Sequence, residues 1–239
     1  MTGTLSQRLA HSASFALIAS ITILSLILMS FMMAEPKISY GQVLEDTQDF
    51  TVRQQITDES SFTTNPSNVT MVGAINGLTG GNATGSTGFR VRSNNATGWL
   101  VTIEFFDNAG DEAMYGETDG DESIRDFVVP GGEPIWGFGA STSARFAYSV
   151  TASSASDLDQ SFKHNNSSTC GGAFSFITAD RCWMAPTQGS EFTILDSGGA
   201  DPVAASSTIT FKVNVPSGAV PPPSAQWYTA TATLSLYTQ

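Results

Sequence analysis

The chain has 239 residues, of which only 13% are charged, and its formal net charge is −12. This balance argues against nucleic acid and against an anionic membrane surface as partners, because both are bound through clusters of Lys and Arg. Hydrophobic residues make up 41% of the chain, which is enough for a sizeable core and excludes a disordered tail.

The first predicted element is an N-terminal export segment over residues 1–34. A polar start with one strong cation, Arg8, leads into residues 15–33, which carry no charge, and Ala34 closes the segment before Glu35-Pro36. This layout is typical of a secretory signal peptide. Residues 15–33 are also long enough for an uncleaved membrane anchor, and a buried core helix is the third interpretation. We therefore expect a protein that is secreted or held at the cell surface, with membrane contact only through residues 15–33 and only if the leader stays uncleaved.

Residues 50–239 are expected to form one domain, preceded by an N-terminal extension over residues 35–49. Hydrophobic and polar residues alternate along several segments, and this period of two indicates half-buried strands. The clearest segments are 99–105, 145–151, 208–215 and 228–237, and weaker ones are 50–56, 69–75, 89–93, 124–129, 174–178 and 192–196.

Turn sequences rich in Gly, Pro and Asn separate the predicted strands. They are Asn76-Gly77, Gly80-Gly81-Asn82, Pro130-Gly131-Gly132, Ser197-Gly198-Gly199 and Pro216-Ser217-Gly218. Residues 50–239 also lack a convincing helical period. Many short strands joined by such turns favour an all-β fold, a single antiparallel β-sandwich of Ig-like or jelly-roll-like type, preceded by the hydrophobic export helix.

The two cysteines, Cys170 and Cys182, are expected to form a disulfide, because an even count in an exported chain favours pairing. Eleven residues lie between them. Closing so short a loop contributes about 3 kcal/mol in the chain-entropy view of disulfides. A metal site is the alternative, and it has only His164 as a further nearby ligand.

The sequence offers little equipment for catalysis. His164 is the only histidine outside the leader, and no Gly-x-Ser-x-Gly elbow accompanies it. Gly137-Phe138-Gly139-Ala140 lacks the third glycine of a dinucleotide-binding loop, so it is interpreted as a bend beside aromatic residues. We therefore expect a protein that is not an enzyme, and one without a cofactor other than calcium.

Calcium is the one metal that the sequence makes plausible. Eight acidic residues lie between positions 107 and 126, and the candidate ligands are Asp107, Asp111, Asp119 and Asp121. The spacing does not match a helix–loop–helix calcium site, since Ile124 stands where glycine is required after Asp119. A solvated acidic loop is the alternative interpretation.

Two kinds of carbohydrate involvement are also considered. Asn-x-Ser/Thr triplets begin at Asn68, Asn82, Asn95, Asn165 and Asn166, and each is a potential glycosylation site in a suitable host. Separately, the aromatic residues around Trp136 and Phe138, with Trp183, Trp227 and Tyr228, are either a sugar-binding face or core packing.

Two stretches resemble a known group of proteins. Thr97-Gly98-Trp99-Leu100-Val101-Thr102-Ile103 and the terminal Tyr228–Leu236 are similar to the two signature regions of WxL-type surface domains, although Leu234 stands where the distal motif has Trp. The order of export signal, Asn-Ala-Thr-Gly-aromatic strand entry and final Tyr-Thr-Ala-Thr strand also resembles exported β-sandwich subunits similar to spore-coat-protein-U and pilin-like proteins. The motif residues are Trp99, Tyr228, Leu234 and Leu236. The WxL resemblance implies cell-wall binding, and the wider one implies a surface subunit.

We therefore expect an exported, non-enzymatic cell-surface protein, a coat, fibre or adhesion subunit that acts through β-strand pairing. Its partners would be further copies of itself or other surface subunits, with residues 35–49 as a candidate donated strand. The alternative is an extracellular glycan- or cell-wall-binding module supported by calcium.

Overall fold

The computed structural model describes residues 4–33, 51–107, 112–128 and 131–239. The chain divides into two compact units, Met1–Gln54 and Gln55–Gln239. The predicted extension over residues 35–49 lies outside the described residues, as does the calcium candidate Asp111.

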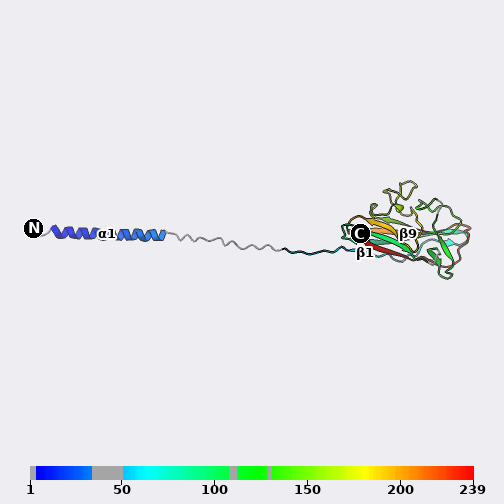
Figure 1. Cartoon of the computed structure of the whole chain (residues 1–239), viewed down its shortest axis with the longest axis horizontal. Coiled ribbons are helices and arrows are strands. Elements are labelled where there is room, and N and C mark those ends of the chain that lie inside the picture. Colours follow the sequence, from blue (N-terminus) through cyan, green and yellow to red (C-terminus); the bar gives the residue numbers. More distant parts are fainter. Residues whose placement is uncertain (1–3, 34–50, 108–111, 129–130) are drawn as a thin grey trace. The chain divides into compact units, whose positions relative to one another are not determined.

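The first unit contains one helix, α1 (Thr4–Met33), drawn in blue in Figure 1. Its sequence has no Gly or Pro, and the Pro that follows at position 36 is a residue that helices avoid in their interior. Hydroxyl groups inside the helix donate to carbonyls three or four residues earlier, as Thr22 does to Ile18. No helix in the described part of the chain is long and apolar enough to cross a membrane. That the leader is an export signal stays a prediction.

In its described residues, the second unit is built of two β-sheets and a single 3-10 turn, η1 (Gln160–Phe162). The large sheet has the strand order β1-β3-β9-β7-β6-β5-β10, with β2 beside β3, and the small sheet has the order β11-β4-β8. The bounds in the large sheet are β1 (Ser60–Thr64), β2 (Ile75–Asn76), β3 (Gly80–Ser93), β5 (Met114–Gly116), β6 (Ser123–Asp126), β7 (Arg145–Ala152), β9 (Asp201–Val215) and β10 (Tyr228–Thr229). Those in the small sheet are β4 (Trp99–Phe105), β8 (Phe192–Ser197) and β11 (Ala232–Thr238).

The prediction of a mainly β fold is confirmed, but the prediction of a purely antiparallel one is wrong. Strands β6 and β7 pair in parallel, with Arg125 opposite Arg145 and Asp126 opposite Phe146. The large sheet is therefore mixed, and it curls into a half-barrel. Parallel pairing is possible because residues 127–144 make a long crossover between the two strands.

The clearest period-two segments form strands as predicted. Strand β4 matches its predicted bounds, and its alternate residues Trp99, Val101, Ile103 and Phe105 are all fully buried. Strand β9 is longer than predicted, and its added residues 201–207 pair with the second half of β3, whereas residues 208–215 pair with the Gly- and Thr-rich first half. The predicted turn at Gly80-Gly81-Asn82 is wrong, because these residues belong to that first half of β3. A Cβ on Gly80 would lie 2.4 Å from the carbonyl oxygen of Val215, so only glycine permits this close strand approach.

Three of the weaker strand predictions fail. Residues 51–56 form no strand, residues 69–75 contribute one bridge at Val72 and the first residue of β2, and residues 174–178 contribute one bridge at Phe176. Short apolar patterns of this kind need a neighbouring strand edge to become a ladder. Residues 51–56 have no such ladder in the structure.

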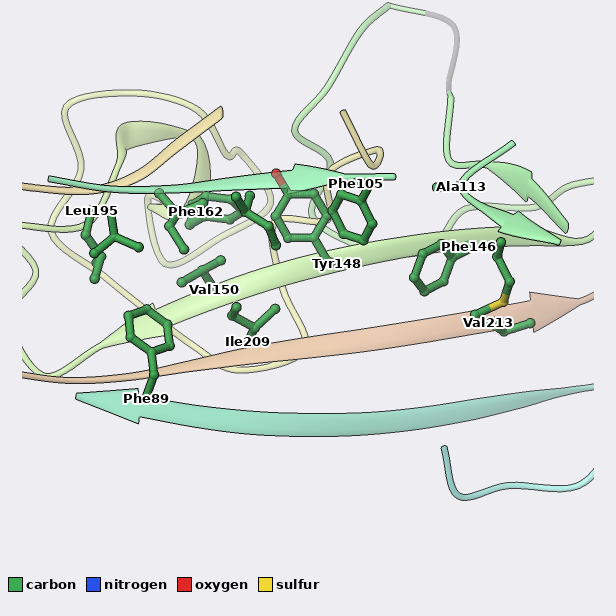
Figure 2. Close-up of a cluster of buried hydrophobic side chains, with 14 of the residues drawn as sticks. Phe89, Phe105, Ala113, Phe146, Tyr148, Val150, Phe162, Leu195, Ile209 and Val213 are labelled. Atoms are coloured by element: carbon green, nitrogen blue, oxygen red, sulfur yellow. The ribbon is translucent and has the colours of Figure 1, made fainter. Parts of the chain in front are cut away.

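One continuous core lies between the two sheets. Figure 2 shows its side chains arriving from β4, β7, β9 and β3, with Phe89 and Leu195 at one end of the row and Phe146 and Val213 at the other. Aromatic contacts link the sheets, since the Phe105 ring meets Phe146 edge-on at 6.1 Å. Burial of such large apolar side chains is the main stabilising contribution to the domain.

Strand β7 is buried on both faces, because loops cover its outer side. A second, smaller cluster of Phe127, Ala147 and Trp183 packs there with Ile135 and Phe138. Backbone bonds hold the covering loop in place, with Met184 and Tyr148 exchanging two hydrogen bonds of 2.8 and 3.1 Å. The predicted disulfide between Cys170 and Cys182 is confirmed, and it lies within this covering loop.

Candidate functional site

A cavity of about 1330 Å³ opens on the inner face of the half-barrel. Its floor is formed by core side chains of both sheets, and its two walls are residues 66–78 and 222–234. Apolar side chains that line it include Met71, Phe105, Phe146, Phe211, Val213 and Leu234. In the row of core side chains in Figure 2, Phe146 and Val213 at one end line the cavity, whereas Phe89 and Leu195 at the other end do not.

Exposed apolar side chains lie at the mouth of this cavity. Leu78 on one wall is 78% exposed, and Trp227 on the other is 73% exposed. Large apolar side chains at the rim of an apolar hollow are a feature of interaction sites. The cavity mouth is therefore a candidate docking site.

Strand β11 forms part of this wall and has only one paired edge. It pairs with β4 alone, and β1 lies close to it without a ladder between them in the described residues. The amide of Phe106 donates to the carbonyl of Thr231, and the amide of Gln239 donates to the carbonyl of Gly98. Bonded pairs alternate along an antiparallel ladder, so the odd-numbered residues of β11 direct their backbone groups at β4.

The even-numbered residues of β11 therefore direct their amides and carbonyls away from β4. They are Ala232, Leu234, Leu236 and Thr238. Within the described ranges, no ladder or separate backbone hydrogen bond uses these outward groups. The edge is also undefended, because β11 has the sequence ATLSLYT, without charge or proline, which are the usual protections of an edge strand.

The residues that carry the family resemblance come together in the small sheet. Leu234 lies opposite Ile103, and Leu236 lies opposite Val101, so the two motif stretches form one antiparallel pair. Both leucines pack partly buried against the core. Trp99 is fully buried, and Tyr228 lies in β10, where it pairs with Gly116 and lines the cavity. All four motif residues thus belong to the core or to the wall of the cavity.

Side-chain hydrogen bonds from Asn95 and Thr97 fix the C-terminal end of β11. The side-chain amide of Asn95 donates to the carbonyls of Gly98 and Gln239, at 2.9 and 2.6 Å, and the Thr97 hydroxyl also donates to Gln239. Asn95 is buried by these contacts. The potential glycosylation triplet at Asn95 is therefore a structural turn, with its nitrogen already engaged.

The acidic loop fastens the second wall of the cavity. The side-chain oxygen of Gln226 accepts the amides of Thr118 and Asp119, both at 2.9 Å, while Glu122 accepts from Ser224 and from the Gln226 amide. The hydrogen bond from the Ser224 hydroxyl is the main reason that the pKa of Glu122 is lowered. These contacts give part of the acidic tract a role in holding residues 222–229.

The structure does not bring the calcium candidates together as a ligand set. Asp107, Asp119 and Asp121 are exposed, and Asp119 accepts the amide of Asp121 at 3.2 Å in a local turn. Within the described residues, no three His, Cys, Asp or Glu side chains are placed to hold a metal ion. Calcium binding stays a prediction.

His164 is a packing residue rather than an accessible base. It is 1% exposed, its ring meets Trp136 edge-on at 4.8 Å, and it stacks on Phe176. Its Nδ1 accepts the amide of Asn166, so Nε2 carries the proton and donates to the Thr178 hydroxyl at 3.0 Å. Burial, with a smaller contribution from Arg181, lowers its pKa, so the ring stays neutral.

The aromatic residues proposed for a sugar face are largely engaged within the protein. The Arg181 guanidinium lies 4.9 Å from the Trp136 ring centroid, and the Lys212 ammonium lies 5.3 Å from that of Phe138. Phe138 also packs on Phe127 and Trp183. These contacts indicate that the aromatic cluster around Trp136 and Phe138 packs over the outer face of β7.

Sequence reasoning missed the two walls of the cavity. Residues 69–75 were predicted as a strand, and no element was predicted between the turn at Pro216-Ser217-Gly218 and the strand that begins at residue 228. The one available signal was Trp227, a large aromatic residue beside a proline-rich turn. Comparison with protein-family models, curated proteins and solved structures gives no match to this chain.

Proposed function

We propose that this chain is an exported, non-enzymatic surface subunit, a component of a coat, fibre or adhesive structure, which contacts its neighbours by β-strand pairing at β11. The observation that carries the proposal is the position of an unpaired, uncharged strand edge on the wall of an open apolar cavity. We infer that the domain is a divergent β-sandwich that remains open along this side.

Strand addition fits this site better than a small ligand does. A cavity of about 1330 Å³ exceeds the usual range of ligand pockets, which is about 300 to 1,000 Å³. An added strand gains main-chain hydrogen bonds from the outward groups of Leu234 and Leu236, and its alternate side chains fill the apolar hollow. Both requirements of strand addition, an edge and a pocket, are present at one place.

Export and a non-enzymatic role are supported by separate features. The apolar leader segment and the Cys170–Cys182 disulfide both suit an oxidising compartment outside the cytoplasm. His164, the one histidine of residues 50–239, is occupied by packing and hydrogen bonds. We accordingly place the protein outside the cell or on its surface.

The proposal is tested by blocking the edge. Proline at Ala232, whose amide faces outward at the first position of β11, removes one edge donor and places a ring where a neighbouring strand would lie. The full chain is expressed with its leader, and assemblies are visualised by electron microscopy and sized by sedimentation. We expect the wild type and the control Ala232→Ser to assemble and Ala232→Pro to remain monomeric. A wild-type chain that stays monomeric at high concentration would overturn the proposal.

A further inference from the structure

Resting on the proposed function, we infer the identity of the strand that docks beside β11. It is residues 51–57 of a second copy of this chain, with Val52 and Ile56 directed into the apolar cavity. The chain thus carries both the site and the segment that fills it.

Residues 51–57 have the pattern of a strand without the structure of one. Their sequence, TVRQQIT, places Val52, Gln54 and Ile56 on one face of an extended chain. In the structure this stretch belongs to no strand, and Val52 and Ile56 are each 82% exposed. Two exposed β-branched side chains on the same face of an extended segment stay in contact with water unless another surface covers them.

The dimensions of the segment suit the recipient edge. Its seven residues equal the length of β11, so both span about 23 Å when extended. Val52 and Ile56 are four residues apart, which separates them by about 13 Å along a strand, and the cavity floor offers Phe105, Phe146 and Phe211 beneath them. The one charge of the segment, Arg53, is positive, whereas the chain as a whole carries −12.

The course of the chain favours a second copy over the same domain. Asn94 accepts the amide of Glu59, donates its own amide to the Glu59 carbonyl, and donates from its side chain to the Thr57 carbonyl. These bonds continue the line of β1 past Ser60, which pairs with Ser93 at one end of β3. The cavity is lined by the other part of β3, at Ala83 and Thr87. Thr57 is therefore held at the end of β3 that does not line the cavity.

Cysteine cross-linking tests the occupant directly. Cys170 and Cys182 are bonded to each other, so an introduced cysteine is the free thiol. One full-length chain carries Ser235→Cys, and a differently tagged chain carries a cysteine at Thr51, Arg53 or Gln55, the positions expected on the same outer face. Mixing and oxidation should give a linked dimer with both tags from at least one position, and none from the distant control Ser156→Cys.

Charge substitutions test the same contact through assembly. Val52→Asp with Ile56→Asp should abolish assembly, while Thr51→Asp with Thr57→Asp, which adds the same charge on the opposite face, should retain it. Because Val52 and Ile56 are exposed in the separate chain, all variants should keep the wild-type β-sheet circular dichroism and melting temperature.

The outcomes separate this inference from the function on which it rests. If wild-type chains assemble, and Ala232→Pro prevents it, but the cross-links and the Val52/Ile56 variant show no effect, the occupant is wrong and edge pairing stands. If a chain with both cysteines links only within itself, the segment docks in its own domain, and the inference is overturned. It is also overturned if the monomer purifies with a bound acyl chain in the cavity by mass spectrometry and does not assemble.

Discussion

The indole Nε1 of Trp99 donates a 2.9 Å hydrogen bond to Oδ2 of Asp201, and this bond joins the small sheet to the large one. Trp99 is the first residue of β4 and Asp201 the first residue of β9. The same carboxylate oxygen also accepts from the hydroxyl of Ser197 at 3.3 Å. The central strand of the small sheet is thereby anchored to the large sheet, and β11 lies beside it as an edge strand.

Substitution of Trp99 by Phe should destabilise the domain. Phe keeps an aromatic ring in the core but removes the donor to Asp201 and leaves a gap beside the smaller ring. We expect a loss of about 2 kcal/mol in the free energy of unfolding, since hydrogen bonds to charged groups contribute more than neutral ones. Urea unfolding measures it, with the exposed Trp227→Phe as control. Equal losses in the two variants would contradict the assignment.

Removal of the disulfide should loosen the cover of β7. Cys170 and Cys182 are 12 residues apart, and replacing both by Ser should cost about 3 kcal/mol of stability. The first effect should be at His164, which packs under the same loop, so its ring protons should broaden or shift in NMR spectra. Unchanged stability together with an unchanged His164 signal would show that the loop is held by packing alone.

Asp126 should make the domain more stable at acidic pH than at neutral pH. Burial raises its pKa to about 6, against its ordinary value of 3.8. The folded state therefore holds this proton more tightly than the unfolded state does, so stability falls as the pH rises from about 4 to about 6.

The variant Asp126→Asn should flatten that dependence. At neutral pH it should gain about 1 kcal/mol, allowing for solvent screening of a partly exposed group. The Gln188 amide, whose nitrogen donates to Asp126 and whose oxygen has no partner in the structure, can turn to accept from the new amide. Urea unfolding from pH 4 to pH 7 is the measurement, and parallel curves for the two proteins would contradict it.

Trp227 should contribute to association and not to folding. At 73% exposed, it stands on the cavity wall, so Trp227→Ala should change the free energy of unfolding by less than about 0.5 kcal/mol. Burial of its indole against an incoming strand would still favour assembly, and the critical concentration should rise about tenfold or more. The control is Val203→Ala, because Val203 is also exposed, at 84%, and does not line the cavity. A similar rise in both variants would argue against a specific site.

The sequence predicted those parts of the fold in which alternation is strong and local. Strand β4 and the disulfide followed from residues within a single segment. The parallel β6–β7 pair did not, because alternation in one strand carries no information about the direction of its neighbour. The Gly-rich half of β3 was missed because its strand state depends on the long partner β9.

The site was only half predictable. The last strand was recognised from the alternation that ends in Leu234 and Leu236, and strand pairing was inferred from it. The cavity could not be inferred, since it is formed where residues 66–78 and 222–234 meet across the sheets, far apart in sequence. Residues 50–56 were expected to be a strand of the domain itself. The exposure of Val52 and Ile56 is the observation from which we infer that these side chains dock in a second copy.

Residue-resolved amide exchange at β11 tests the central claim most directly. The amides of Thr233 and Ser235 face β4 and should be protected in every state, which makes them internal controls. The amides of Leu234 and Leu236 face outward, and we expect them to exchange fast in the monomer and to become at least tenfold more protected after assembly. Fast exchange at Leu234 and Leu236 in assembled material would contradict strand pairing at this edge.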